Sequence, residues 1–594
     1  MGAVFGNGLV IIFASSLIFA PSIVWSLYRQ PSVTVLAGGS ALTVAVASGI
    51  TYLTGTLGVG SIMPLRALAI LLAVVLLWAI VRSALLVHRK KYSAATTTDA
   101  MAFTFGIGTG IWILVPPLVA LRQQGLTFGL VTMGNADLPN YVLLAEQTAS
   151  AGFANNNHLA NVDLGSQARE LSYIGASALI NFVSAGTGLP AWQATFATMG
   201  VAVSLLVVAL CALGRAFWPT ANYSIIAAVL VATLASLSCL TYGQFFLAGV
   251  LGLAGVTTSL AGATLIARGE GGQGLLAIVG GGAIAVYSYA QLGLPALLML
   301  PFWAIVAAKS IGGLAWGNLL KIGARAATAV SLAVLLSAIY LPTAFNLIRT
   351  QSHIQAGWTM PVLTSQAALV WPTGIARHSS RSTVIGSWAI VLVVAIFALT
   401  CAWRWGLRAS AVLCSVITVS ILVVVAGVVY VYGPDRYQAW KMEAFLLPIA
   451  IVLTLPALSA VSINNVRVGR TVLAAGVGAV LLAPFASWTP ALSQPNPAVI
   501  TTSPLASLAH VPALAKVASL NIRLSSAFET MSAGAILTKS VVIFTRNSDY
   551  PAEASLRTCT LTTRSMLAPG ETDVVDLGGG YVLLERPSKC AMRK

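Results

Sequence analysis

The chain has 594 residues, of which 58% are hydrophobic and only 8% are charged, and its net charge is +17. Soluble domains carry about 25% charged residues, so this composition excludes an ordinary soluble protein and predicts a polytopic helical membrane protein. The apolar runs are continuous, without the alternation of an outer-membrane barrel. The basic residues lie mostly in short connections between the runs, as in membrane proteins, and no nucleic-acid partner is expected.

Apolar runs long enough to cross a bilayer recur along most of the chain. One crossing needs about 20 apolar residues. The first residues, MGAVFGNG, lack the basic segment of a secretory signal, so the first run is expected to remain as a membrane helix. The pattern predicts about fourteen spans. They lie at about 8–28, 33–53, 64–87, 101–121, 191–213, 222–241, 244–267, 275–291, 294–308, 325–345, 385–404, 409–432, 443–461 and 471–489.

Basic residues indicate how the spans are oriented. The cluster HRKKY at 88–92 is predicted to face the cytoplasm, where Lys and Arg concentrate in membrane proteins. Alternation of the spans then places both chain ends on the outer side, and the plasma (inner) membrane is the expected location. It also places most other basic connections on the cytoplasmic side, namely those with Arg29, Arg215, Arg268, Lys309, Lys321, Arg404, Arg408, Arg467 and Arg470.

Four longer segments fall on the predicted outer side, and polar residues accumulate in them. They are 122–190, 346–384, 433–442 and the region from about 490. The cytoplasmic connections are short and contain no GxxxxGK[ST] motif, so no ATPase is expected. The predicted organisation is a membrane domain, 1–490, followed by an extracytoplasmic domain, 491–594.

The composition changes near residue 494. The segment 504–524 has helical periodicity, whereas 540–546 and 579–587 read as strands flanked by turns. The predicted fold class is therefore an all-α polytopic membrane protein with a small C-terminal α/β domain. On the outer side of a membrane, a disulfide between Cys559 and Cys590 is expected.

The first long outer segment, 122–190, holds several of the chain's few acids. Residues 138–152 have helical spacing, and 166–186 are predicted to form a half-apolar helix lying at the membrane interface. A polar turn, ANNNHLANVDLGS, links the two. The acids are Asp137, Glu146, Asp163 and Glu170.

This arrangement resembles the GT-C superfamily of membrane glycosyltransferases. An acid in the first long outer loop is followed by a Y…A helix, an interfacial helix and a TGLPAW stretch that leads into the next span. The matching positions are Asp137, Tyr141, Ala145, Gly152, Tyr173 and GTGLPAW at 186–192, with YSYAQLGLP at 287–295. The chain departs from the family in having three extra spans before the loop and no second acid beside Asp137, and in this it looks like the actinobacterial cell-wall arabinosyltransferases.

The resemblance implies transfer of a sugar from a polyprenyl-phosphate donor to a glycan or lipid acceptor of the cell envelope, at the outer membrane face. Such transfer needs a carboxylate as general base for the acceptor hydroxyl. Asp137 is the first candidate and Asp163 the second. Transfer also needs cations that hold the donor phosphate. The candidates are Arg436, Lys441, Arg377, Arg381 and His378.

Further residues are candidates for binding the substrates, namely Tyr141, Glu146, Tyr437 and Trp440. Each assignment has a structural alternative. Asp137 can cap a helix, and Asp163 can be a turn residue. Glu146 can lie on a solvated helix face or pair with Arg122 or Arg169. Arg436 and Lys441 can pair with neighbouring acids as an interfacial anchor. A divalent cation, Mg or Mn, could bridge a loop acid and phosphate, but the sequence contains no dedicated set of metal ligands.

Two other functions remain open at this point. A lipid flippase or other transporter would need ionisable residues near the middle of the membrane or broken helices in two repeats. The apolar runs contain almost no central charges and show no repeat of halves. A polymerase or ligase of lipid-linked glycans would use an outer loop rich in Arg and His, and 346–384 partly fits that description.

Overall fold

The computed structural model describes most of the helical part of the chain and much of its C-terminal region. The described residues are 2–28, 32–88, 94–132, 137–150, 173–219, 225–226, 228–230, 232–233, 246–312, 316–355, 400, 437–454, 456, 499–515, 517, 519–525, 527–537, 542–545, 559–567, 569–571 and 574–584. Within this part, eight helices are long and apolar enough to cross a membrane, which supports a polytopic helical membrane protein.

Most of these helices lie where the sequence predicts a membrane span. They are formed by α1 (Gly2–Tyr28), α2 (Val33–Thr56), α3 (Ile62–His88), α4 (Ala94–Trp112) continued by α5 (Val115–Gln123), α9 (Ala191–Phe217), α11 (Leu247–Ala267), α12 (Gly271–Gly312) and α13 (Trp316–Leu336). Of the other predicted spans, 385–404, 409–432 and 471–489 lie outside the described residues, apart from residue 400. The predicted spans 222–241 and 443–461 are described only in part, the latter by α18 (Tyr437–Thr454). The total of fourteen therefore stays a prediction.

One predicted span is displaced. The run at 325–345 corresponds to α13, which ends at Leu336 and is followed by the short 3-10 helix η2 (Ala338–Tyr340) and by α14 (Leu341–Gln355). The predicted start of this span lies too far along the chain because Lys321 and Arg325 interrupt the apolar run. Both side chains are exposed, and such residues can lie along an apolar surface while their charged heads reach the interface.

Helix α12 folds back on itself. The backbone at Tyr289 is non-helical, with φ −156° and ψ 71°. A Cβ placed on Gly282 would lie 2.6 Å from Leu297, and one on Gly293 would lie 2.7 Å from the carbonyl carbon of Ala285. These contacts are possible only if the two halves run antiparallel. The two halves of α12 correspond to the two short apolar runs predicted at 275–291 and 294–308.

Three consecutive glycines place the first half of α12 at the centre of the bundle. A Cβ on Gly280 would lie 2.3 Å from the carbonyl oxygen of Gly38 on α2, and one on Gly281 would lie 2.6 Å from that of Gly255 on α11. Gly282 faces the second half of α12. Because lipid tails are as apolar as side chains, helices in membranes associate through close packing of small residues. The glycines allow this approach on three sides.

The basic ends of two helices lie together. The Arg268 guanidinium at the end of α11 donates a hydrogen bond to the Phe217 carbonyl at the end of α9, over 3.4 Å. The Phe217 ring also lies 6.1 Å from that of Trp303 in the second half of α12. Two basic connections that the alternation of spans assigns to one side are thus adjacent.

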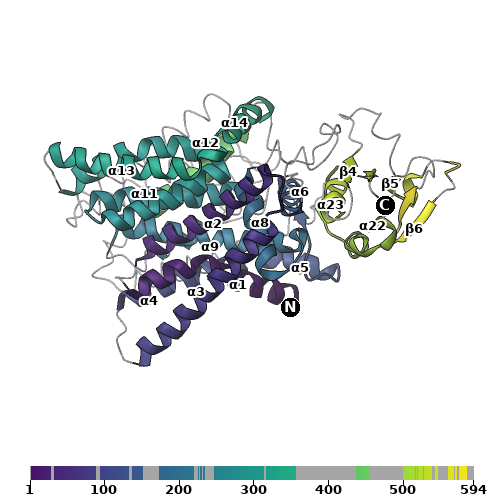
Figure 1. The fold of residues 1–594 in the computed structure, drawn as a ribbon, viewed down its shortest axis with the longest axis horizontal. Helices are drawn as coiled ribbons and strands as arrows, with labels where there is room; N and C mark the ends of the chain where they lie inside the picture. Colours follow the sequence, from purple (N-terminus) through teal and green to yellow (C-terminus); the bar gives the residue numbers. More distant parts are fainter. Residues whose placement is uncertain are drawn as a thin grey trace.

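The C-terminal region contains a mixed sheet with short helices. Strands β3 (Ser519–Ile522), β4 (Val542–Thr545), β5 (Cys559–Thr563), β6 (Val574–Gly578) and β7 (Tyr581–Leu584) form a sheet in the order β4-β3-β5-β7-β6. β3 is parallel to β4 and β5, and the β5–β7 and β6–β7 pairs are antiparallel. The helical elements are α21 (Ser503–Ser507), η5 (Leu508–His510), α22 (Pro512–Ala515), α23 (Ala527–Leu537) and the 3-10 turn η7 (Arg564–Met566). Figure 1 shows this region at one end of the helical bundle.

The helical periodicity of 504–524 describes this segment only in part. The segment forms three short helical elements and then the strand β3. Pro512 has no backbone N–H and begins a new turn. Leu520 and Ile522 are fully buried because β3 is a central strand, paired on both sides. Pairing with strands distant in sequence overrides the local periodicity.

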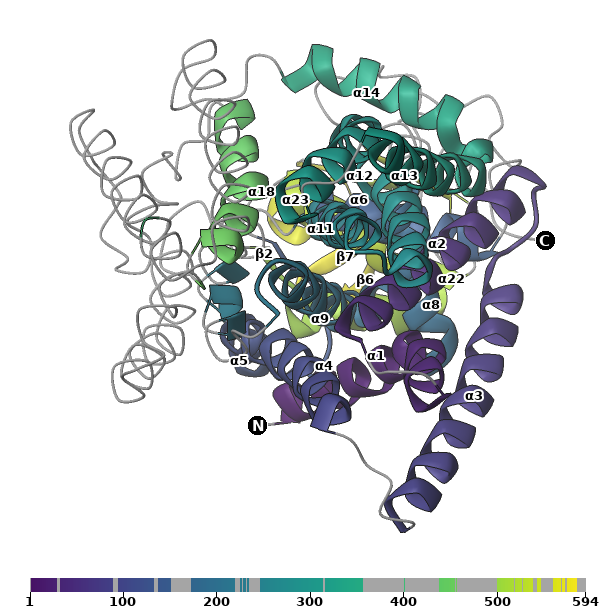
Figure 2. The same ribbon diagram turned by 90° about the vertical axis from the view of Figure 1, so that its left-hand side faces the viewer.

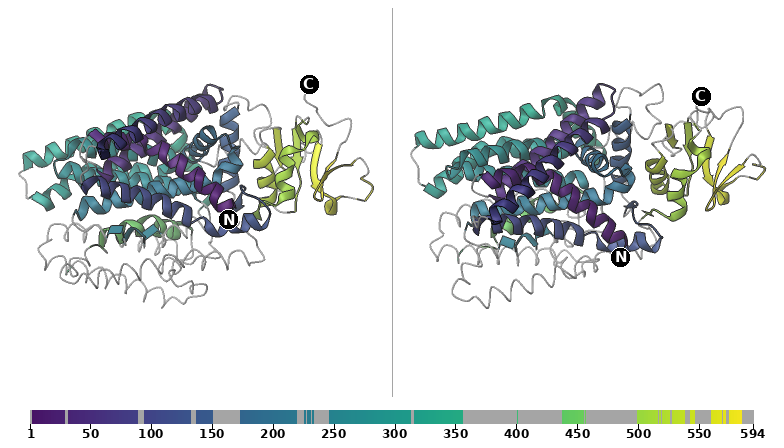
Figure 3. Two further views of the ribbon diagram at one scale, coloured as in Figure 1. Left: turned by 90° about the horizontal axis from the view of Figure 1, so that it is seen from below. Right: turned by 60° about the horizontal axis from the view of Figure 1, so that its bottom comes forward.

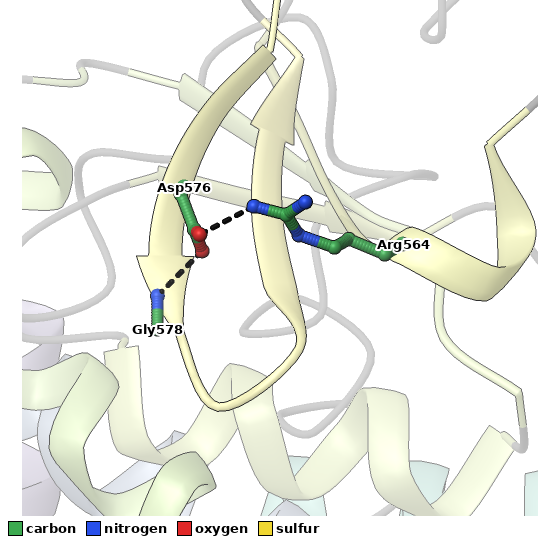
Figure 4. Close-up of polar contacts among 3 residues, drawn as sticks. All are labelled: Arg564, Asp576 and Gly578. Carbon is green, nitrogen blue, oxygen red and sulfur yellow. Dashed lines mark hydrogen bonds and ion pairs between the residues drawn. The ribbon is translucent and has the colours of Figure 1, made fainter.

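The hairpin of β6 and β7 turns through glycines with positive φ, at Gly578, Gly579 and Gly580. Figure 4 shows the Asp576 carboxylate accepting a hydrogen bond from the Gly578 N–H and pairing with Arg564. These two contacts, the backbone one first, lower the pKa of Asp576. The pair is exposed and is expected to contribute little to stability.

Candidate functional site

The helix that carries the proposed catalytic acid is α6 (Asp137–Ser150), which agrees closely with the predicted 138–152. Asp137 is its first residue. The structure describes only the backbone at this position, so both interpretations of the side chain, catalytic base or helix cap, stay predictions. The neighbouring Leu138 is fully buried, so α6 is packed against the rest of the protein from its first turn.

The second part of the helix predicted at 166–186 is observed as α8 (Ile174–Thr187), and residues 166–172 lie outside the described residues. Every residue from Ile174 to Ala185 is buried, and α8 contacts α2, α3, α6 and α9. The helix is thus packed inside the protein rather than spread on its surface. The Ser177 hydroxyl donates a 3.0 Å hydrogen bond to the Tyr141 carbonyl, which joins α8 to α6. Tyr141, a candidate for substrate binding, is itself 4% exposed.

Glu146 does not lie on a solvated face. It is 7% exposed, and its Oε1 accepts a 3.0 Å hydrogen bond from the backbone N–H of Ala191. Ala191 is the first residue of α9, and a carboxylate at a helix N-terminus is stabilised by the helix dipole. Through this hydrogen bond Glu146 caps the N-terminus of α9, which is a structural role. A role in substrate binding stays a prediction.

A buried amide links three elements and was not identified from the sequence. The Asn181 Nδ2 donates to the Thr148 hydroxyl oxygen at 2.9 Å and to the Ser61 hydroxyl oxygen at 3.3 Å. The Ser61 N–H donates to the Thr148 carbonyl at 2.8 Å. The start of α3 is thereby joined to α6 and α8. An Asn within the apolar stretch SALINFVS was the available signal, since polar side chains in membrane helices join neighbouring helices.

Aromatic rings bring the end of the acid-bearing loop next to α18. The Tyr173 ring, which directly precedes α8, lies 5.3 Å from the Tyr289 ring at the turn of α12. The Tyr289 ring lies 5.1 Å from that of Phe445 on α18. Tyr289 therefore stands between the two segments in which the sequence predicts the base and the phosphate-binding cations.

Three more tyrosine contacts surround this junction. The Tyr340 ring stacks on Tyr287 at 5.3 Å and meets Tyr52 edge-on at 5.1 Å. Its hydroxyl accepts a 3.4 Å hydrogen bond from the Ile174 N–H. Together with Phe445 on α18, the junction thus joins α2, α8, α12, α18 and η2. Tyr287 and Tyr289 both belong to the YSYAQLGLP stretch that contributes to the GT-C resemblance.

Helix α18 is held at its middle and in its last turn. Phe445, midway along the helix, packs at the junction, and the Trp218 indole N–H donates a 3.0 Å hydrogen bond to the Leu453 carbonyl in the last turn. Figure 2 shows α18 on one flank of the bundle. Tyr437, Lys441 and Phe445 are spaced by four residues, so they share one face of this helix. Trp440 lies on the same helix.

The remaining candidates lie outside the described residues. They are Asp163, Arg377, His378, Arg381, Arg436 and Cys590. Cys559 takes part in a disulfide, but its pairing with Cys590 stays a prediction. Within the described ranges, no group of three His, Cys, Asp or Glu residues comes together to hold a metal ion. A divalent cation at the candidate site stays a prediction.

No profile of a known protein family matches the chain, and no curated protein shows significant similarity to it. The candidate site therefore rests on the residues and their geometry.

Proposed function

We propose that this protein is a glycosyltransferase that moves a sugar from a polyprenyl-phosphate donor to a glycan or lipid acceptor on the outer face of the plasma membrane. The observation that supports it best is the junction of Tyr173, Tyr289 and Phe445. It joins the loop that carries the acids to the helix that begins beside Arg436 and carries Lys441. A transferase of this kind needs both at one place.

In the proposed reaction, the Asp137 carboxylate removes the proton of an acceptor hydroxyl as its oxygen attacks the anomeric carbon. The new bond joins that oxygen to the sugar. The bond between the anomeric carbon and the phosphate oxygen breaks, and its electron pair leaves with the polyprenyl phosphate. Asp163 is the alternative base.

The leaving phosphate carries more negative charge as the bond breaks. Cations at the outer end of α18 stabilise it more strongly in the transition state than in the ground state. Arg436 can bind two phosphate oxygens at once, whereas Lys441 acts as a point charge. Arg377, Arg381 and His378 of the second outer loop are further phosphate ligands in this proposal. Tyr437 and Trp440 offer flat faces to the sugar or the lipid chain.

The extracytoplasmic placement of 491–594 completes the proposal. Both views in Figure 3 show the yellow C-terminal strands beyond the end of the bundle, and helix α23 contacts α6. The C-terminal region is therefore at the same end as the acid-bearing helix. On the proposed topology, this end is the outer one.

The test is sugar transfer by the purified protein in lipid nanodiscs, with a panel of polyprenyl-phosphate pentoses and hexoses as donors. We expect Asp137→Asn to lower kcat by about 10²- to 10⁴-fold, the usual contribution of a general base. Donor binding should be retained, because the acid acts on the acceptor.

Asp576→Asn is the matched control, since this exposed carboxylate lies on the β6–β7 hairpin. It should keep the wild-type rate. Undiminished transfer by Asp137→Asn, with a loss in Asp163→Asn, would move the base to Asp163. A wild-type protein inert toward every donor would refute the proposed function.

A further inference from the structure

The segment Leu126–Thr132, here called the strap, leads directly to the acid-bearing helix. Its last two residues form β1 (Val131–Thr132), which pairs antiparallel with β2 (Val499–Ile500) at the start of the C-terminal region. Only residues 133–136 separate the strap from Asp137. The position of the strap therefore limits where Asp137 can lie.

On its C-terminal side the strap is held by one threonine. Thr501 is fully buried, and its backbone N–H donates a 2.9 Å hydrogen bond to the Leu130 carbonyl. Its hydroxyl oxygen accepts a 2.9 Å hydrogen bond from the Leu130 N–H and lies 3.1 Å from the Leu130 carbonyl. Both backbone polar groups of Leu130 are thus satisfied by Thr501. The two residues are 371 positions apart in the chain.

On its other side the strap is fixed to the membrane bundle. The Asn7 amide on α1 is fully buried and donates a 2.9 Å hydrogen bond to the Thr127 carbonyl. A Cβ on Gly129 would lie 2.8 Å from Leu121 and 3.2 Å from the Cβ of Thr501. The strap is therefore enclosed between α1, α5 and the residues that follow β2.

The C-terminal region also contacts the acid-bearing helix itself, through α23 and α6. It thus meets the chain on both sides of Asp137, at the strap before it and at the helix after it. Neither contact is part of the proposed chemistry.

We propose that Thr501 is a positioning residue for Asp137, and that the C-terminal region serves catalysis by holding the strap. This inference rests on the proposed glycosyltransferase function. Without the Thr501 hydroxyl, the buried Leu130 N–H has lost its partner, and strap conformations that pair it with water gain population. The carboxylate then spends less time at the acceptor hydroxyl.

The central variant is Thr501→Val, which keeps the shape of the side chain and removes the hydroxyl. We expect kcat to fall about 10- to 100-fold, as for a small misplacement of a catalytic group, while the donor KM stays at the wild-type value. Thr501→Ser keeps the hydroxyl and should stay within about threefold of the wild type. Hydrogen–deuterium exchange of 126–132 should rise in Thr501→Val and not in Thr501→Ser.

Thr562→Val is the matched control. Thr562 is buried in β5, and its hydroxyl has no hydrogen-bond partner among the residues that the structure describes, so its loss should change neither kcat nor exchange in the strap. Equal effects of the two Thr→Val variants would mean general loosening of the C-terminal region and would overturn the proposal. Wild-type kcat in Thr501→Val would overturn it as well.

A covalent link gives a rescue. Val131 and Ile500 are Cα partners in the β1–β2 ladder. Replacing both by Cys in the Thr501→Val background allows a disulfide to hold the strap. Turnover should return when the pair is oxidised and be lost again on reduction. Failure of the oxidised pair to restore turnover contradicts the positioning role.

The two proposals fail in different ways. If the wild type transfers sugar and Asp137→Asn does not, but Thr501→Val is fully active, the function stands and the positioning role is refuted. If the wild type transfers nothing, the function and the catalytic part of the inference are both refuted. The exchange experiment still decides whether Thr501 holds the strap.

Discussion

Helices α3 and α9 are both 27 residues long and strongly apolar, yet they have opposite surroundings. The most apolar stretch of α9 is entirely buried in the protein, whereas only 17% of that of α3 is buried. Figure 2 shows α3 at the rim and α9 inside. In a membrane both surroundings are apolar, so hydropathy does not distinguish a buried helix from an exposed one. Small and polar residues distinguish them, as in α9, where Gly200 and Ser204 contact α4.

The largest expected effect tests the glycine contact between α4 and α9. A Cβ on Gly110 would lie 2.3 Å from the backbone oxygen of Gly200, and a backbone atom cannot move aside as a side chain can. We expect Gly110→Leu to destabilise the protein by about 3 kcal/mol or more. The measurement is the thermal unfolding midpoint in detergent. Gly108 lies on the open face of the same helix, and a Cβ placed there has no atom within 4 Å. Gly108→Leu should therefore change the unfolding midpoint little.

A smaller effect is expected for matched leucines in the two compared helices. Leu206 of α9 is fully buried, and Leu71 of α3 is 59% exposed. Leu206→Ala should cost about 2 kcal/mol, because it leaves a cavity between helices. Leu71→Ala should cost less than about 0.5 kcal/mol, since lipid fills the space. Equal losses in the unfolding free energy would show that the surroundings of the two helices do not differ as described.

The smallest expected effect concerns the buried amide. Asn181→Leu removes the two hydrogen bonds from α8 to Thr148 and Ser61. Hydrogen bonds between membrane helices contribute about 1 kcal/mol each or less, so we expect a loss of about 1 kcal/mol in unfolding free energy. A variant as stable as the wild type would show that the two hydrogen bonds of Asn181 do not contribute to the stability of the protein.

Much of the fold could be predicted from the sequence. The spans of α1, α2, α3, α9 and α11 follow from apolar runs, and the two halves of α12 from two short runs. The helix at 138–152 follows from its spacing. Errors arose where charged residues interrupt a span, as at Lys321 and Arg325, and where β3 is formed by pairing with distant strands.

The candidate site was only partly predictable. The acids and cations could be chosen from residue type and position in the outer segments. The burial of Glu146 against Ala191 could not, because that hydrogen bond joins residues 45 positions apart. The contacts among Tyr173, Tyr289 and Phe445 could not be predicted either, nor could the hydrogen bonds between Thr501 and Leu130. Such contacts depend on which helices become neighbours.

The sequence by itself determined that this chain enters a membrane, because the transfer free energy of an apolar run is a sum over its own residues. It also determined where acids and cations fall along the chain. Only the tertiary structure decided which apolar helices are exposed at the rim of the bundle and which pack against one another. It also decided that the C-terminal region binds the strap before Asp137. These are properties of pairs of distant residues, and their energies exist only when the folded chain brings both partners together.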